Sequence, residues 1–480
     1  MENYIISDGR RQKTLMAVVC FGALMANMDA TIVNVCLPTI AGELNLSPSI
    51  ASILILAYLL FETGPLMAFG KLGDLFGGRR VFLAGFSLFT LSSFACGMAT
   101  SFWPLVIMRA VQGVGGAMIF SVMLSFAALY IPTSRRGRAM GWTTTAAALG
   151  VALGPTVGGF IAHYVGWRYV FFINVPLGLA ALAIGYAVLP KEHPPARDKR
   201  FDLLGALYQT VFLMSFLFAV NRGLELGWLS LPILSAFAVC LVLAVLLVRR
   251  ELRIDYPVLD FRLFANRDTL LATLTHCLSM MALGGVLFLM PFYLQDVRNL
   301  PADIIGLIMS VISFGQFLGP FAGQLGDRVG HKKVTLAGVF LGLVAFGMFT
   351  IMDFGEPLWW AVSALVLFGL SQGLNRAPNI QLILASVPPE RKGTAASITA
   401  LMRSLGLVLG VVVFETTFSE LIPASVSLDA ISLGKSGVAA ESLHEGFVAT
   451  FLVGLVVSAV MVAMITAVRG APKAAGAATK

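Results

Sequence analysis

The stretch Gly70–Gly85 reads GKLGDLFGGRRVFLAG, and far down the chain Gly323–Gly338 reads GQLGDRVGHKKVTLAG. Both place a basic pair after the same Gly-Asp-x-x-Gly turn. Two more resemblances follow in the same order, between Gln112-Gly113 and Gln372-Gly373, and between IPTSRRG at Ile131–Gly137 and VPPERKG at Val387–Gly393. The chain therefore contains two copies of one structural unit.

The composition is that of a membrane protein. The 480 residues are 58% hydrophobic and 12% charged, and the mean hydropathy is +0.87. A soluble protein would be about a quarter charged. The five cysteines all lie in apolar stretches without Cys-x-x-Cys spacing, which predicts packing residues and no disulfide or metal site. The first apolar run, 14–38, is too long for a cleavable signal peptide and is expected to span the membrane.

Fourteen segments are long and apolar enough to cross a bilayer, which takes about 20 residues of helix. Six precede a polar link, two follow it, and six complete the chain. Their predicted bounds are 14–38, 50–70, 80–99, 103–127, 138–162, 168–189, then 203–221 and 229–248, then 269–293, 303–325, 334–353, 358–380, 394–418 and 447–468.

The basic residues orient these spans. Most Lys and Arg fall in alternate links, including those at 71–80, 135–138, 191–200, 249–267 and 328–333. The intervening links hold only Arg168, Arg222, Arg298 and Lys435. Because cytoplasmic loops carry the excess of Lys and Arg, both termini are predicted to be cytoplasmic. The net charge of +8 thus reflects topology and gives no reason to expect nucleic-acid binding.

The repeat and the spans together predict an all-α integral membrane protein built from two pseudo-symmetric six-helix bundles. We expect the first bundle in residues 1–190, a linker with two inserted helices in 191–268, and the second bundle in 269–480. Parallel repeats related by an axis along the membrane normal are a transporter architecture, in which the substrate path lies between the halves.

The repeated turn has a predicted role at the cytoplasmic face. Its glycines permit a tight reversal and close helix approach, and its aspartate can accept from backbone N–H groups or pair with Arg. It is therefore interpreted as a latch that holds one side shut, with a plain topological anchor as the alternative. The residues involved are Gly70, Gly73, Asp74, Gly77, Arg79 and Arg80, with Asp327 in the second copy.

Five ordered motifs carry a family resemblance that extends over the whole chain. GKLGDLFGGRR is similar to the signature between the second and third helices of the major facilitator superfamily. The others resemble motifs of its fourteen-helix drug:proton antiporters: MDATIVNVCLP at Met28–Pro38, LVIMRAVQGVGG at Leu105–Gly116, GVALGPTVGG at Gly150–Gly159 and GWRYVFFINVPLG at Gly166–Gly178. The resemblance implies that fold and proton-coupled export.

Asp29 is the leading candidate for the coupling site. A carboxylate near the middle of a span is costly and by default functional, although it can also serve as a structural hydrogen-bond acceptor. The resemblance implies that Asp29 binds protons or a cationic substrate, and that Arg109 and Gln112 of the fourth-helix motif relay the proton. A structural ion pair is the alternative for Arg109. Asn34 lies five positions beyond Asp29 and need not share its helix face.

Glu62 departs from the family pattern, which usually has an apolar residue near this place. It is expected to add a second acidic site, to change the preferred substrate charge, or only to pair with a basic residue. In the second half Arg376, Arg403 and Glu415 fall within predicted helices, and the lone His276 is expected to be structural.

The fifth-helix motif is poor in side chains. Gly150, Gly154, Gly158 and Gly159 allow neighbouring helices to approach closely, and Pro155 leaves a backbone carbonyl without its helical partner. The motif is interpreted as a hinge or a seal, with simple packing as the alternative. In the family it accompanies antiport, which favours export.

No motif predicts an enzyme or a cofactor. LGKSG at Leu433–Gly437 lacks the first glycine of a phosphate loop, and the histidines have no metal-ligand spacing. The resemblance, together with the fourteen spans, the fifth-helix motif and Asp29, implies transport of lipophilic or amphipathic compounds driven by the proton motive force, with a dedicated transporter of one metabolite as the alternative. The expected setting is a bacterial inner membrane, where the chain works as a monomer, alone or with a periplasmic adaptor.

Overall fold

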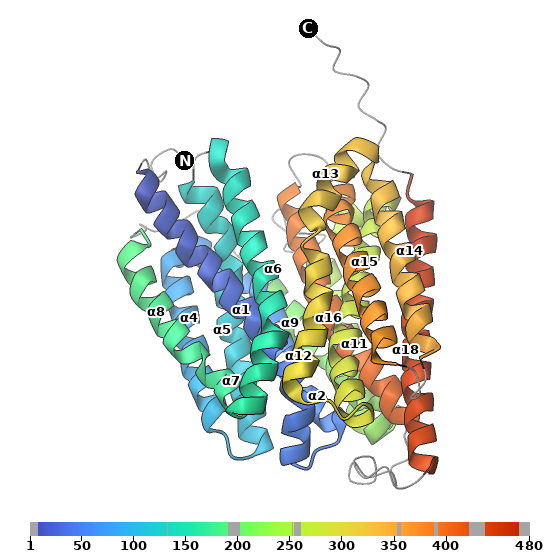
Figure 1. Cartoon of the computed structure of the whole chain (residues 1–480). Coiled ribbons are helices and arrows are strands. Elements are labelled where there is room, and N and C mark those ends of the chain that lie inside the picture. The colour runs from blue at the N-terminus through green and yellow to red at the C-terminus, as the bar shows by residue number, and fades with distance from the viewer. Residues whose placement is uncertain are drawn as a thin grey trace.

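The computed structural model is all-helical in its described part, which comprises residues 8–131, 133–190, 202–251, 253, 261–352, 357–387, 392–421 and 437–469. Figure 1 shows two groups of roughly parallel helices side by side, with both chain ends at the upper edge. The helices are α1 (Gly9–Glu43), α2 (Pro48–Thr63), α3 (Leu66–Phe76), α4 (Gly78–Met98), α5 (Phe102–Tyr130), α6 (Thr133–Tyr164), α7 (Tyr169–Phe172), α8 (Asn174–Val188), α9 (Leu203–Leu226), α10 (Leu231–Glu251), η2 (Phe261–Ala265), α11 (Arg267–Phe292), η3 (Tyr293–Val297), α12 (Ala302–Gln316), α13 (Gly319–Val329), α14 (His331–Thr350), α15 (Leu358–Ala385), α16 (Lys392–Leu421) and α18 (Gly437–Ala467).

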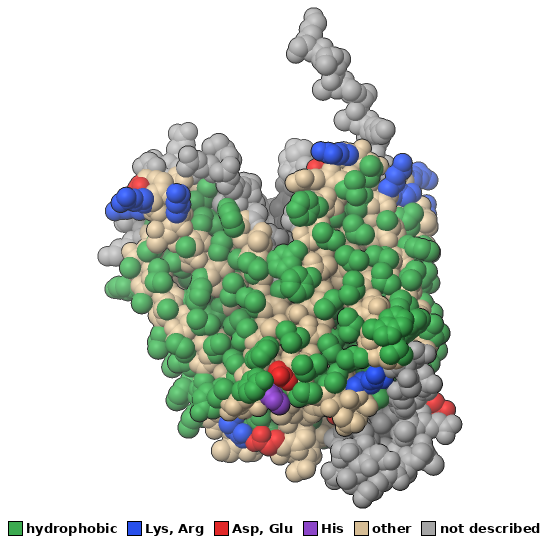
Figure 2. Space-filling view, viewed as in Figure 1, with side chains coloured by type: hydrophobic (Ala, Val, Ile, Leu, Met, Phe, Trp, Pro, Cys, Tyr) green, Lys and Arg blue, Asp and Glu red, His purple; other side chains and the backbone are tan. Residues whose placement is uncertain are grey.

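Twelve stretches of the described chain are long and apolar enough to cross a membrane, and two shorter apolar helices lie at Ile50–Thr63 and Leu207–Val220. The protein is therefore a multi-pass membrane protein with twelve candidate spans. The two short helices fall where the sequence predicts the second and seventh of its fourteen spans. Figure 2 shows the broad side of the molecule covered by hydrophobic side chains, with Lys and Arg concentrated toward its upper rim.

The predicted single span at 50–70 is wrong in one respect, because the helix is interrupted. α2 ends at Thr63, and α3 begins at Leu66 after Gly64 and Pro65. The span predicted at 303–325 is likewise divided, since α12 ends at Gln316 and α13 begins at Gly319. In both places a proline follows a glycine, and proline removes a backbone donor and clashes with the preceding turn.

The two copies of the repeated turn have the same backbone conformation. Gly77 joins α3 to α4 with φ 95°, and Gly330 joins α13 to α14 with φ 101°. Each glycine N–H donates to the carbonyl four residues earlier, at Gly73 and Gly326. Because side chains disfavour this left-handed region, glycine is required at both turns.

Contacts between the two groups of helices concentrate on two pairs. α6 packs along α12, and α2 packs along α16. Within the groups the same pairings recur, α1 with α6 and α4 with α5 in one, α11 with α16 and α14 with α15 in the other. The inserted helices α9 and α10 pack on each other, and α9 also touches α2, α3 and α16.

Replacing Gly77 or Gly330 by Ala is expected to lower the free energy of unfolding by about 1–2 kcal/mol, because each alanine would occupy a left-handed conformation. Unfolding of the purified protein in mixed detergent micelles, followed by circular dichroism, measures this change. Gly9→Ala is the control, since its added Cβ meets no atom within 4 Å and it lies at a helix start. If all three variants were equally stable, the requirement for glycine at the two turns would be contradicted.

Candidate functional site

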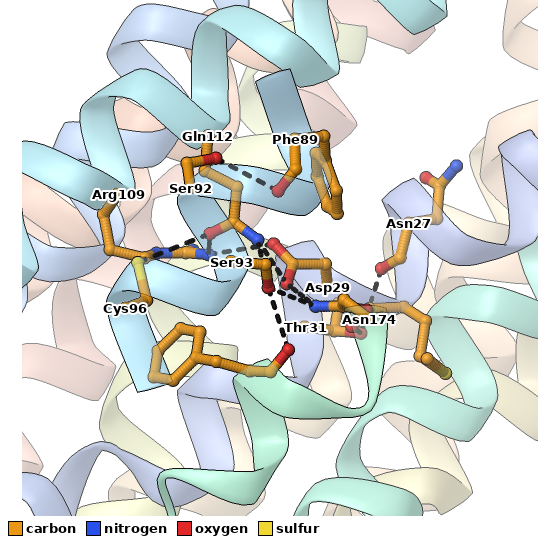
Figure 3. Close-up of polar contacts among 12 residues, drawn as sticks. Asn27, Asp29, Thr31, Phe89, Ser92, Ser93, Cys96, Arg109, Gln112 and Asn174 are labelled. Atoms are coloured by element: carbon orange, nitrogen blue, oxygen red, sulfur yellow. Dashed lines mark hydrogen bonds and ion pairs between the residues drawn. The ribbon is translucent and has the colours of Figure 1, made fainter. Parts of the chain in front are cut away.

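Asp29 is the centre of a buried polar network between α1, α4, α5 and α8. Its side chain is completely inaccessible to solvent. Its Oδ2 accepts a hydrogen bond from Arg109 Nη1 at 2.8 Å, and its Oδ1 accepts from Gln112 Nε2 at 3.0 Å and Asn174 Nδ2 at 2.6 Å. Figure 3 shows these groups converging on the carboxylate. The structure thus brings three of the predicted site residues, Asp29, Arg109 and Gln112, into direct contact.

Arg109 is held on several sides. Its Nη1 also donates to Gln112 Oε1 at 2.8 Å, and its guanidinium lies 4.3 Å from the ring centre of Tyr58 and 5.8 Å from that of Phe171. The side chain is 1% exposed. Removing two charges from water costs several kcal/mol each, which an ion pair offsets only with good geometry and further hydrogen bonds. This pair has both.

Three members of the network were missed by sequence reasoning. Ser93 Oγ accepts from Gln112 Nε2 and Asn174 Nδ2, both at 3.1 Å, and donates to the Phe171 carbonyl at 2.9 Å. Asn174 begins α8 inside the quoted motif GWRYVFFINVPLG, and Tyr58 stacks on Arg109. A polar side chain within an apolar helix was the available signal for Ser93 and Asn174, but only the packing of α4, α5 and α8 shows that they meet.

Asn34 does not reach this network. It is buried on α1, and its Oδ1 has no hydrogen-bond partner. Five positions of helix rotate a side chain by roughly 140° away from the starting face. Its assignment as a site residue remains a prediction without a contact to Asp29 among the described residues.

Glu62 lies between the two groups of helices. It is buried on α2, and its Oε1 lies 4.0 Å from Nη2 of Arg403 on α16. The Arg403 guanidinium is also 5.8 Å from the ring centre of Phe120 on α5. Tyr58 precedes Glu62 by one helical turn, so it stands between the Asp29–Arg109 pair and the Glu62–Arg403 pair.

The glycines of α6 bring three helices into backbone contact. A Cβ added at Gly150, Gly154 or Gly158 would collide with α1 at Leu24, Thr31 or Ile32. On the opposite side an added Cβ at Gly159 would strike the Ala302 carbonyl of α12. Pro155 lies inside α6, and a Cβ at Gly306 would strike its carbonyl. The motif therefore lets α6 pack closely against both α1 and α12.

The predicted latch is only partly described. The Asp74 side chain lies outside the described part of the structure, so its partner remains a prediction. Arg79 Nη2 donates to the Tyr186 carbonyl of α8 at 2.7 Å and stacks on its ring, whereas Arg80 is exposed. Asp327 is exposed and pairs with His331 one turn later at 3.2 Å. Gly70 faces Ser121, and Gly73 faces Val122, both on α5.

The second half has an uncharged counterpart of the Asp29 network. Ser279 Oγ donates to Gln372 Oε1 at 2.7 Å, and Gln372 Nε2 donates to the Ser279 carbonyl at 3.1 Å. Gln372 matches Gln112 in the repeat, but its partners are the hydroxyl and the carbonyl of Ser279, and no arginine among the described residues donates to it. Among the described residues no group of three His, Cys, Asp or Glu side chains is placed to hold a metal ion.

Comparison with known proteins identifies the family. The model of the Major Facilitator Superfamily matches residues 19–411. The chain belongs to the major facilitator superfamily. It is a transporter that carries small molecules across a membrane, and it is not an enzyme.

The relatives differ in what their names say they carry. The chain is 32% identical over 409 residues to the riboflavin transporter RibZ of Clostridioides difficile (strain 630), covering 85% of this chain and 88% of RibZ. It is 31% identical over 424 residues to the multidrug resistance protein Stp of Mycobacterium tuberculosis (strain CDC 1551 / Oshkosh), and the alignment covers 87% of this chain and 78% of Stp.

A solved structure shares the fold at low sequence identity. A bacterial homologue of the human lysosomal transporter Spinster, in an inward-facing and unoccupied conformation, aligns with a TM-score of 0.64 and 16% identity. The alignment covers 96% of this chain and 98% of that chain.

Arg109→Met is expected to destabilise the protein by about 3–5 kcal/mol, because it leaves the Asp29 carboxylate buried without its counter-charge. Adding Asp29→Asn should restore most of that loss, since the pair is then replaced by neutral groups. Denaturant unfolding of the wild type, both single variants and the double variant gives the coupling free energy. A double variant no more stable than Arg109→Met would contradict the network.

Proposed function

We propose that the protein is a proton-coupled exporter of lipophilic or amphipathic compounds that works by alternating access. The observation that carries this proposal is the fully buried Asp29 carboxylate, which is paired with the Arg109 guanidinium and accepts hydrogen bonds from two side-chain amides. An intramembrane carboxylate of this kind is a default candidate for a proton relay. Asp29 takes up the proton, and Arg109, which keeps its own charge, loses its partner when that happens.

The proposed architecture has fourteen spans and both termini in the cytoplasm. The first bundle comprises residues 1–190, the second 269–480, and the linker 191–268 supplies two inserted helices. Support comes from the matched turns at Gly77 and Gly330, and from the recurring helix pairings in the two groups. α2 together with α3, and α9 with its 24 residues, account for the two spans beyond the twelve candidates.

We propose that the contacts of α6 with α12 and of α2 with α16 form the closed extracellular gate. They lie toward the end of the molecule opposite the termini in Figure 1. Next to them, Tyr164 of α6 donates to Asp303 of α12 at 3.3 Å, and Thr39 donates to Gln295 at 3.4 Å beside a pocket of about 430 Å³. Alternating access requires these contacts to part while the opposite end closes.

Gly306→Val is expected to push α12 away from α6, because an added side chain would strike the Pro155 carbonyl. Spin labels placed on the outer ends of α6 and α12 should then show a longer distance by pulsed electron resonance. Gly347→Val is the matched control, since its Cβ has only a side-chain contact at 4.0 Å. An unchanged distance in Gly306→Val would argue against this gate.

Drug export is favoured by the fifth-helix motif, which in the family accompanies antiport, and by relatives named multidrug resistance proteins. The second candidate is a dedicated transporter of one metabolite, favoured by the relative named a riboflavin transporter. In either case we place the protein in a bacterial inner membrane, as a monomer.

Proton flux in proteoliposomes tests the proposal. With a pH gradient imposed, adding lipophilic compounds should release protons in the wild type, whereas Asp29→Asn should lower this flux by at least about a hundredfold, as loss of an essential proton carrier does. Asn27→Ala is the control, because its amide donates to the Ala23 carbonyl on the same helix and not to Asp29. Tracer transport that continues after the gradient is collapsed would overturn proton coupling. A response to a single compound would favour the dedicated transporter.

A further inference from the structure

Arg376 is a half-buried cation without a carboxylate partner in the described part of the chain. It lies about two-thirds of the way along α15, and its Nη1 donates to Gln316 Oε1 of α12 at 3.4 Å. No described carboxylate oxygen lies within 4.0 Å of it, in contrast to Arg109 and Arg403. Charges within spans are costly and usually face a partner, a cavity or a ligand.

Arg403 lies on α16, which packs against α15, the helix that carries Arg376, and against α11. Arg403 is 24% exposed and has Glu62 at 4.0 Å, a distance too long for a hydrogen bond. It also faces Phe120 of α5, which places Arg403 at the boundary between the two groups of helices.

The charges at this boundary do not balance. Asp29 and Arg109 neutralise each other in direct contact. Glu62 is the described acidic neighbour of Arg403, which leaves the positive charge of Arg376 without a described counter-charge. Retaining an unbalanced charge in a low-dielectric setting is expensive, so a site that does so is suited to a ligand of opposite sign.

Unpartnered polar groups accompany the arginines. The Nε2 of Gln316, whose Oε1 accepts from Arg376, is buried and has no acceptor. Asn379, one turn beyond Arg376, donates to the Ala272 carbonyl of α11 at 3.0 Å. Next to Ala272 the Thr273 hydroxyl is 1% exposed and has no hydrogen-bond partner. These donors, on α12 and α11, suit the oxygens of a carboxylate or sulfonate.

We propose that Arg376 and Arg403 bind an anionic group of the transported compound, so that the preferred substrates are lipophilic organic anions. This inference rests on the proposed function in that it names the substrate class of the same transporter. In the proposed site, Arg376 and Gln316 bind the anion, and Arg403 interacts both with the anion and with Glu62.

Equilibrium binding of two isosteric ions tests the assignment. Tetraphenylborate and tetraphenylphosphonium have nearly the same size and opposite charge, and binding to the transporter in nanodiscs is measured by dialysis against empty nanodiscs. We expect the wild type to bind tetraphenylborate more tightly than tetraphenylphosphonium. Arg376→Gln should weaken tetraphenylborate binding roughly tenfold or more, because it removes a positive charge that attracts the anion.

Two further variants distinguish an effect of the Arg376 charge on binding from an effect of the substitution on folding. Arg267→Gln removes an exposed cation at the start of α11 and should leave both affinities unchanged. Arg376→Lys keeps the charge and should retain most of the tetraphenylborate affinity, even if Arg376→Gln folds poorly. Tighter binding of tetraphenylphosphonium, no binding of tetraphenylborate, or equal weakening by Arg376→Lys and Arg376→Gln would overturn the proposal. Because binding is measured without a proton gradient, these outcomes are independent of whether transport is proton-coupled.

Discussion

The rest of the first group of helices depends on the buried contact between Asp29 and Arg109. Neither charge tolerates burial alone, and the pair tolerates it only because Gln112 and Asn174 complete the hydrogen bonds of the carboxylate. This requirement draws α1, α4, α5 and α8 to one point, with Ser93 and the Phe171 carbonyl fixing the amides in turn. The same contact that stabilises the group is the one that protonation would loosen.

Glycine packing supplies the second constraint. Along α6 the missing side chains allow α1 and α12 to approach backbone to backbone on opposite faces, so one helix links the Asp29 network to the contact between the groups. Apolar packing in a membrane gains little from the hydrophobic effect, which leaves close van der Waals contact as the main attraction. Such a contact is also easy to part, as a gate must be.

The two halves share a repeat but not an electrostatic design. The first half balances its charges internally at Asp29 and Arg109, whereas the matching place in the second half joins the uncharged side chains of Ser279, Gln372 and Asn375. The second half instead carries Arg376, which contacts Gln316, and Arg403, which has Glu62 of the first half as a described acidic neighbour. This difference is the reason that we propose proton coupling in the first half and binding of the charged group of the substrate in the second half.

The sequence by itself determined the membrane setting, the repeat and most helices, because spanning requires long apolar runs and the repeated Gly-Asp-x-x-Gly turn needs glycine at Gly77 and Gly330. It also pointed to Asp29, Arg109 and Gln112, since charges within apolar runs are conspicuous. Only the tertiary structure decided that Asn174, Ser93 and Tyr58 join them while Asn34 does not, and that Glu62 faces Arg403 across the boundary. Hydropathy locates a polar residue along a helix, but its partners depend on how distant helices rotate and pack, which no local pattern specifies.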